Sequence, residues 1–441
     1  MDKKTTSGAF FKDAALMLAN NILLLAVSLF SGVLIARGLG PEGKGLYAIA
    51  LLFPTLLAGL GSLGLNYAGI YFLNKEPENR PYLAGSSLLY SAAAGTLLSL
   101  LVAVFSGAIS GRFLAGSGTA YIIAAAPLAL LLMLVENIFH FFLASRDIKN
   151  IAIFTSTRNI SHLAMVAVFY FLGSLTVLRT LLSQSAALAA ALVFGVLALR
   201  AKGFFSGLAW QWPVFRNMLS FGLKQHVGTA AQMLNYRIDM FIAAALLTPY
   251  QVGLYSVSVS MAELLWHIAN SAGQVLYPKI AASDRAAADS FTPEVARHVF
   301  FLTLLSAAAL WAAANPLTVL LFGKDFLPAT AALKILLPGV VLLSVSKVIG
   351  SDISARGYPH YNSTASVISL VTAASLSLVL IPRFGVAGAA IATSASYLAN
   401  SAVMLFFFRK VSGTGITGMF LPGKKDFIFY RDQAAALFKR F

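Results

Sequence analysis

The sequence predicts an all-α integral membrane protein with about twelve transmembrane helices, arranged as two six-helix lobes related by an axis along the membrane normal. Its composition is the first reason, because 59% of the residues are hydrophobic and only 11% are charged, whereas about a quarter are charged in globular proteins. The second reason is a series of long apolar runs, and the third is a short motif that occurs once in each half of the chain. Most of the chain is therefore expected to have lipid as its solvent.

Twelve apolar runs have about the length, roughly 20 residues, that a helix needs to cross a bilayer. They cover residues 14–36, 46–72, 83–109, 120–144, 151–172, 179–199, 219–247, 253–277, 295–321, 330–351, 362–381 and 385–408. No run alternates in the manner of a strand, so the spans are expected to be helices that satisfy their own backbone groups. The connections between them are short and leave no room for a soluble catalytic domain.

The repeated motif is Pro-x-x-x-Gly-Leu-Tyr, at residues 41–47 and again at 249–255. Each copy joins two apolar runs, the first to the second and the seventh to the eighth. Internal repeats are typical of secondary transporters, and six spans separate the copies, so both halves enter the membrane with the same polarity. The predicted organisation is a lobe over 1–200, a cytoplasmic linker over 201–216, a second lobe over 217–410 and a basic amphipathic cytoplasmic tail over 411–441.

Lysine and arginine gather in alternate connections, on the side that also holds the N-terminus and the tail; Arg158 is assigned to this side. The positive-inside rule then places both termini in the cytoplasm, as expected for a multi-pass protein of a bacterial cytoplasmic (inner) membrane. The net charge of +16 does not predict a nucleic-acid partner, because the charges are scattered over loops where anionic lipid head groups hold them. The tail is expected to lie on the inner membrane surface, with binding to a partner protein as the alternative.

Two glycine motifs resemble nucleotide-binding loops, and both are rejected. Residues 38–44 match the start of a phosphate-binding loop, but Gly45 stands where a Ser or Thr would hold magnesium. Residues 59–64 match the Gly-x-Gly-x-x-Gly fingerprint inside an apolar run. Both motifs need a strand before them, whereas small residues at this spacing let helices approach closely. No cofactor is predicted, and the absence of cysteine excludes thiolate chemistry.

Two segments place a glutamate one helical turn before a histidine, Glu136 before His140 and Glu263 before His267. A metal between two helices would need more carboxylates than the spans offer, so no metal site is predicted. Two interpretations stay open for these pairs. They exchange protons in ion coupling, since histidine titrates near neutrality, or they form structural contacts between helices.

The most informative polar residues are Arg237 and Asp239 in the seventh span. Each costs about 2.5–3.5 kcal/mol or more at the centre of a membrane helix, so both should face protein or water. Two positions amount to about 200° around a helix, which predicts a separate partner for each. Arg237 either binds an anion or forms a structural ion pair with Glu263 or Glu136, and Asp239 is a candidate for ion coupling.

Two further cations, Lys334 and Lys347, flank Pro338 and Gly339 in the tenth span, where the Pro-Gly pair predicts a break in the helix. A pathway lined by Arg237, Lys347, Lys334 and Arg37 would attract a pyrophosphate, with arginine offering bidentate geometry and lysine a point charge. As an alternative for Lys334, its side chain extends to water from the outer end of the span.

Several short segments together carry a family resemblance. They are Arg37 to Ala48, Asn235 to Asp239, Val252 to Ser256, Leu276 to Ile280, Leu321 to Gly323, Leu337 to Gly339, Ala355 to Gly357 and Gly385 to Ile391. In this order the chain resembles the Wzx-type polysaccharide-export flippases of the multidrug/oligosaccharidyl-lipid/polysaccharide exporter superfamily. The resemblance covers most of residues 10–410.

The resemblance implies a transporter, not an enzyme, with two lobes around a central cavity. Its substrate would be a polyprenyl-pyrophosphate-linked oligosaccharide, an O-antigen or exopolysaccharide repeat unit, moved from the cytoplasmic to the outer leaflet by alternating access. Membrane lipids and polysaccharide-assembly proteins are the implied partners, and Arg237 is the position best matched to the cationic cavity of such flippases.

Two other functions are weighed against the flippase. In an ion-coupled exporter of amphipathic cations the first helix often carries a carboxylate, whereas Asn20 and Asn21 occupy it here. A membrane polymerase or glycosyltransferase would need a large loop or clustered acids for acid–base chemistry, and the sequence has neither.

Overall fold

The computed structural model describes residues 3–114, 116, 118–205 and 207–421. Most of the predicted amphipathic tail, residues 422–441, lies outside the described residues. Helices make up nearly all of the described chain, and no strand occurs in those ranges. The prediction of an all-α membrane protein is confirmed.

The helices of the first half are α1 (Lys3–Gly61), α2 (Leu65–Lys75), η1 (Pro77–Asn79), α3 (Arg80–Val104), α4 (Ser106–Phe113), α5 (Thr119–Ala125), α6 (Leu128–Ala144), α7 (Ile148–Phe171) and α8 (Val177–Ala201). Those of the second half are α9 (Trp212–Asn235), α10 (Ile238–Leu246), α11 (Pro249–Glu263), α12 (Trp266–Ala282), α13 (Arg285–Ala312), α14 (Ala314–Phe322), η2 (Lys324–Phe326), α15 (Ala329–Ala355), α16 (His360–Ser412) and η3 (Thr417–Met419).

Within the described residues, nine helical segments are long and apolar enough to cross a membrane. Two of them, Ala19–Lys75 and His360–Ser412, contain 57 and 53 residues, enough for two crossings of about 20 residues each. The backbone leaves helical geometry at Gly40 (φ 67°) and Gly385 (φ 57°), positive φ values that glycine adopts without steric cost. The chain is therefore a multi-pass membrane protein, and the number twelve stays a prediction.

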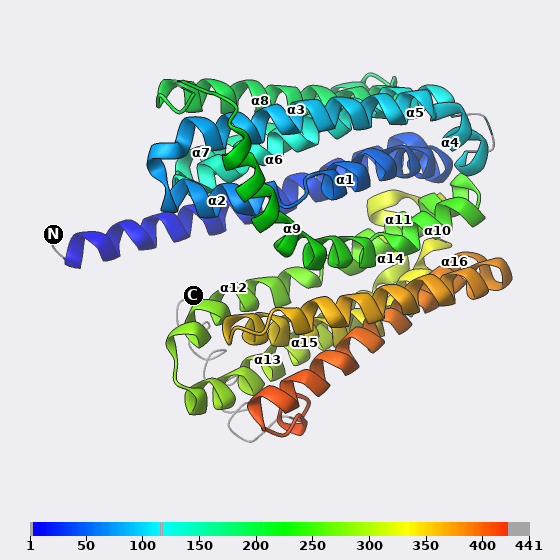
Figure 1. The fold of residues 1–441 in the computed structure, drawn as a ribbon. Coiled ribbons are helices and arrows are strands. Elements are labelled where there is room, and N and C mark those ends of the chain that lie inside the picture. Colours follow the sequence, from blue (N-terminus) through cyan, green and yellow to red (C-terminus); the bar gives the residue numbers. More distant parts are fainter. Residues whose placement is uncertain (1–2, 115, 117, 206, 422–441) are drawn as a thin grey trace, which may run out of the picture. The chain divides into compact units, whose positions relative to one another are not determined.

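The chain forms two compact units. The first comprises residues 1–234, 243–256 and 319–326, and the second comprises 235–242, 257–318 and 327–441. In the first unit α3, α6, α7 and α8 run side by side (Figure 1), and α1 packs on α6 and α7. In the second unit α15 packs against α12, α13 and α16. The division into lobes at 201–216 stays a prediction.

Neither of the two rejected glycine motifs follows a strand; the first lies within α1, and the second spans the end of α1 and the turn before α2. Residues 38–44 belong to α1 on both sides of the Gly40 kink, so the strand and loop of a phosphate-binding motif are not formed there. Gly59, Gly61 and Gly64 pack against the Met233 side chain, the Leu98 side chain and the Gly222 carbonyl; a Cβ at each would meet these atoms at 2.2–2.6 Å. These glycines permit close helix packing, as predicted.

The two copies of the repeated motif pack against each other inside the first unit. A Cβ on Gly45 would lie 1.7 Å from the carbonyl oxygen of Pro249, and a Cβ on Gly253 would lie 1.8 Å from the carbonyl oxygen of Pro41. The glycine of each copy lies against the carbonyl oxygen of the proline in the other copy, so the contact is reciprocal. Only glycine fits at either position, which gives the repeat a structural reason beyond ancestry.

The predicted helix break at Pro338 and Gly339 is wrong. Helix α15 continues from Ala329 to Ala355 with Pro338 inside it. The Gly339 amide donates a hydrogen bond to Ser394 Oγ at 3.1 Å, and a Cβ on Gly339 would lie 2.6 Å from that oxygen. Gly339 therefore lets α15 and α16 approach closely, and this packing holds the helix in place around the proline.

A buried ionic network ties the end of α15 to α13. Arg356 donates to Asp289 at 2.5 Å and to Asp352 at 2.8 Å, and Thr292 donates to the second oxygen of Asp352 at 2.7 Å. The Asp352 side chain is fully buried and that of Arg356 is 10% exposed. Removal of one partner would leave a buried charge without compensation.

We expect Arg356→Ala to destabilise the protein by about 3–5 kcal/mol, the usual cost of breaking a buried ion pair. Thermal unfolding of the purified protein in detergent measures this loss. The matched control is Arg285→Ala, because Arg285 is 74% exposed and 3.9 Å from the same Asp289. The control should change stability by at most about 1 kcal/mol, and equal losses for the two variants would contradict the structural role of Arg356.

Candidate functional site

Two interrupted helices form the candidate site in the second unit. Helix α9 ends at Asn235 and α10 begins at Ile238, so Tyr236 and Arg237 lie in the gap. Helix α11 ends at Glu263 and α12 begins at Trp266, and the gap is bridged by tighter i to i+3 hydrogen bonds from Leu265 and Ile268. Irregular backbone at membrane depth is tolerated where protein or a water-filled cavity surrounds it, and in transporters discontinuous helices form substrate sites.

The acidic and basic residues at these gaps have separate partners, as their spacing predicts. Arg237 Nη1 lies 3.9 Å from Glu263 Oε1. Asp239 is buried, accepts a hydrogen bond from Thr393 Oγ1 at 2.9 Å and accepts another from the Met240 amide at 2.6 Å. The Arg237 side chain is 48% exposed, so the ion pair with Glu263 leaves much of its guanidinium open to another ligand.

A second cation, Lys347 of α15, lies against aromatic rings of the same site. Its Nζ donates to Tyr236 Oη at 3.2 Å and lies 4.6 Å from the centre of the Trp266 ring. The Tyr236 and Trp266 rings are 5.0 Å apart, and Tyr397 is 5.9 Å from Trp266. Cation–π contacts of this kind hold an ammonium group against an aromatic face and leave it able to attract an anionic ligand.

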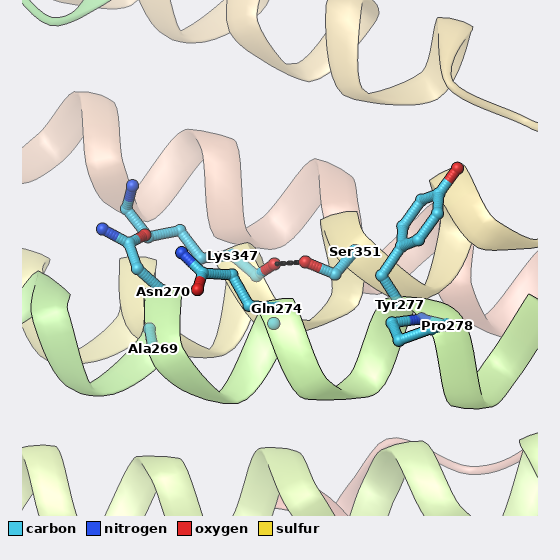
Figure 2. Close-up of a pocket in the computed structure, with 8 residues that line it drawn as sticks. Ala269, Asn270, Gln274, Tyr277, Pro278, Lys347 and Ser351 are labelled. Carbon is cyan, nitrogen blue, oxygen red and sulfur yellow. Dashed lines mark hydrogen bonds between the residues drawn. The ribbon is translucent and has the colours of Figure 1, made fainter. Parts of the chain in front are cut away.

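A cavity of about 490 Å³ adjoins Lys347. Figure 2 shows Asn270 and Gln274 of α12 grouped with Lys347 toward one end, and Tyr277 and Pro278 toward the other. The volume lies within the range of ligand pockets, about 300–1,000 Å³. Lys347 is the charged residue among those that line the cavity in the described part of the chain. Amide groups, an aromatic ring and a cation together suit a polar, anionic ligand.

The other predicted site residues have different surroundings. Lys334 lies 4.8 Å from the centre of the Trp311 ring and is 13 positions from Lys347, about 20 Å along the helix. In the first unit, Arg37 donates to the carbonyl oxygens of Leu320 and Leu321 at the end of α14. Also in that unit, Glu136 lies 3.8 Å from His140, the pairing that their one-turn spacing allows.

Several residues of the site were not predicted from the sequence. Tyr236, Trp266, Asn270, Gln274 and Tyr397 are uncharged, so the cost of membrane insertion does not single them out. The signal available was position, because Tyr236 precedes Arg237 and Trp266 precedes His267. Nothing in the sequence pattern indicates that α9 and α11 end beside these residues.

Comparison with known proteins gives the family. A family model described as polysaccharide biosynthesis protein matches residues 11–283, more than half of the chain. The chain belongs to the polysaccharide biosynthesis protein family. A second model, described as lipid II flippase MurJ, matches residues 190–427. The family of this second model is one of transporters rather than enzymes.

Curated relatives of this family member are distant. A probable low-salt glycan biosynthesis flippase, Agl15 of Haloferax volcanii, is 25% identical over 50% of this chain and 49% of its own length. An uncharacterized membrane protein of Methanocaldococcus jannaschii is 22% identical over 86% and 80%. The capsular polysaccharide biosynthesis protein CapF of Staphylococcus aureus is 24% identical over 42% and 47%. The alignment spans about half the length of the first and third of these relatives.

Solved structures share the fold of this chain. The lipid II flippase MurJ in an inward closed conformation superposes with a TM-score of 0.77 at 17% identity, over 92% of this chain and 89% of that one. An inward-facing multidrug resistance MATE transporter of the MOP superfamily gives 0.71 at 14% identity, over 88% and 94%. The chain therefore shares the fold of these two structures.

Proposed function

We propose that this protein is a flippase that moves a polyprenyl-pyrophosphate-linked oligosaccharide from the cytoplasmic to the outer leaflet. The observation that carries the proposal is the pair of cations at the gap between α9 and α10: Arg237 lies in the gap, and Lys347 of α15 contacts the neighbouring Tyr236 and lines a polar cavity. Arginine binds phosphate oxygens in a bidentate manner and lysine adds a point charge. The amide and aromatic groups next to Lys347 would contact the first sugars, while the lipid tail stays in the bilayer.

The reciprocal glycine contact supports an alternating-access mechanism. The two copies of the motif come from the two sequence halves, and both are predicted to lie on the outer side of the membrane. In this proposal, Gly45 and Gly253 close the outer side while the substrate enters from the cytoplasm, and the contact opens for release. Packed helices have discrete arrangements rather than continuous ones, which suits such a gate.

Ion coupling is assigned to the acidic residues. Asp239 and Glu263 are the candidates in the second unit, and Glu136 is the candidate in the first. An exporter of amphipathic cations, the alternative function, would use the same acids to bind its substrate. The site argues against it, because Glu263 pairs with Arg237, Thr393 donates to Asp239, and the neighbouring cavity carries Lys347.

The proposed location is the cytoplasmic membrane, with both termini in the cytoplasm, and the proposed glycan is an O-antigen or exopolysaccharide repeat unit. Depletion of the protein in cells tests the function. We expect the lipid-linked glycan to accumulate on the inner leaflet, as measured by its protection from an enzyme or label applied outside. Delivery to the outer leaflet at the normal rate would refute the flippase assignment.

A further inference from the structure

The first unit contains a second basic pocket, separate from the site around Arg237. It has a volume of about 300 Å³ and lies between the two arms of α1, on either side of the Gly40 kink, and helices α7 and α8. The lining residues that could donate hydrogen bonds to a ligand include Lys44, Tyr47, Arg158, Asn159, His162 and Gln184. No aspartate or glutamate is among the residues that line it in the described chain.

Arg158, which the charge distribution assigns to the cytoplasmic side, lies inside helix α7. It is ten positions after Ile148, the first residue of the 24-residue helix α7, which places it about 15 Å along the helix axis. Helix α7 is one of the segments able to span a membrane.

The positive charge in this pocket has no acidic partner within the described chain. Among those residues, neither Lys44 nor Arg158 forms an ion pair with an aspartate or glutamate. The contact recorded for Lys44 is with the Tyr47 ring, 5.4 Å from its centre. Two partly buried cations without a carboxylate partner are costly, and an anion that enters the pocket would remove that cost.

The histidine of the pocket is prepared to donate a hydrogen bond. His162 Nδ1 lies 3.3 Å from Ser31 Oγ, whereas its Nε2 is buried and has no hydrogen-bond partner among the residues that the structure describes. When Ser31 donates to Nδ1, the neutral ring carries its hydrogen on Nε2. A buried donor without a partner is destabilising, and an oxyanion in the pocket would accept this hydrogen bond together with those from Arg158 and Lys44.

We propose that this pocket binds a phosphate group. The volume is at the lower end for ligand sites, and arginine and lysine beside neutral donors are the groups that bind phosphate oxygens. The phosphate comes either from the diphosphate of the lipid-linked substrate or from free inorganic phosphate. The assignment of this pocket as a phosphate site does not depend on the proposed function. The assignment of its phosphate to the lipid-linked substrate rests on that function.

Titration of the purified protein in detergent with inorganic diphosphate, followed by calorimetry, tests the proposal. The wild type should bind at two sites, one around Arg237 and one around Arg158. Arg158→Gln and Arg237→Gln should each retain one site. His162→Leu, which has no hydrogen-bond donor, should weaken the first-unit site by about tenfold, the value of one hydrogen bond to a charged group. Arg158→Lys should retain binding because the charge remains.

Binding at a single site, and competition between ligands, would also discriminate between the possibilities. A single site that is lost in Arg237→Gln but unchanged in Arg158→Gln would overturn the proposal. A single site that is lost in Arg158→Gln alone would support it while counting against Arg237 as the substrate site. Competition by a polyprenyl diphosphate at the first-unit site would identify the lipid as the source, and competition by orthophosphate alone would identify the free anion. Thermal unfolding of each variant in the same buffer verifies that it is folded.

Discussion

Arg237→Ala is expected to lower the transport of the lipid-linked glycan by about 100-fold or more, while the protein remains in the membrane at its normal level. Two hydrogen bonds from a guanidinium to phosphate oxygens, each about 1.5–3 kcal/mol, account for a loss of this size. Arg237→Lys should retain part of the activity, because lysine keeps the charge but not the bidentate geometry. Binding and transport of the substrate by reconstituted protein measure both effects.

The ion pair with Glu263 provides the control that separates binding from structure. If Arg237 serves only to neutralise Glu263, the double variant Arg237→Ala with Glu263→Ala should recover the binding that the single arginine variant loses. If Arg237 binds the diphosphate, the double variant should remain defective, and Glu263→Gln alone should bind the substrate normally. Recovery in the double variant would assign Arg237 to a structural role.

Gly45→Val and Gly253→Val are each expected to abolish transport by preventing closure of the outer side. The Cβ would overlap the carbonyl oxygen of Pro249 or Pro41 at 1.7 or 1.8 Å, and backbone on both sides leaves no flexible group to yield. Since the contact is reciprocal, the two variants should have the same phenotype, and the double variant should be no worse. Gly69→Val is the control, because a Cβ at Gly69 meets no described atom within 4 Å.

The chain contains no cysteine, so a single introduced cysteine reports on this gate. Ser256→Cys is conservative in size and lies one turn after Gly253, in a buried position. A membrane-impermeant maleimide applied from outside should modify the introduced thiol faster when Gly45→Val is also present than when Gly45 is retained. Equal rates of modification would show that the glycine contact does not control outer access.

The fold could be predicted from the sequence because its strongest determinants are local. Apolar runs of membrane-spanning length specify helices, and the Pro-x-x-x-Gly-Leu-Tyr repeat marks a real contact at Gly45 and Gly253. Pro338 and Gly339 show the limit of this reasoning. A proline predicts a break from local sterics alone, whereas the packing of Gly339 on Ser394 holds α15 continuous.

The candidate site was predicted only in its charged residues. The cost of a charge in the membrane identified Arg237, Asp239 and Lys347, and their partners follow from how the helices pack. The breaks after Asn235 and Glu263 have no proline or glycine in the gap, so the sequence gives no local sign of them. Arg158 and His162 were not predicted as site residues for a related reason. They are four positions apart on α7, and they line a pocket only because α1 and α8 pack beside them.

Reconstitution of the purified protein into liposomes tests the central claim most directly. The vesicles would contain a fluorescent oligosaccharide on polyprenyl diphosphate, and a quencher or glycan-cleaving enzyme outside would report transfer across the bilayer. We expect transfer that depends on the protein, is lost in Arg237→Ala, and is much slower for the same glycan on polyprenyl monophosphate. No transfer beyond that of empty liposomes, or equal rates for the diphosphate and monophosphate lipids, would contradict a flippase that holds its substrate by the diphosphate.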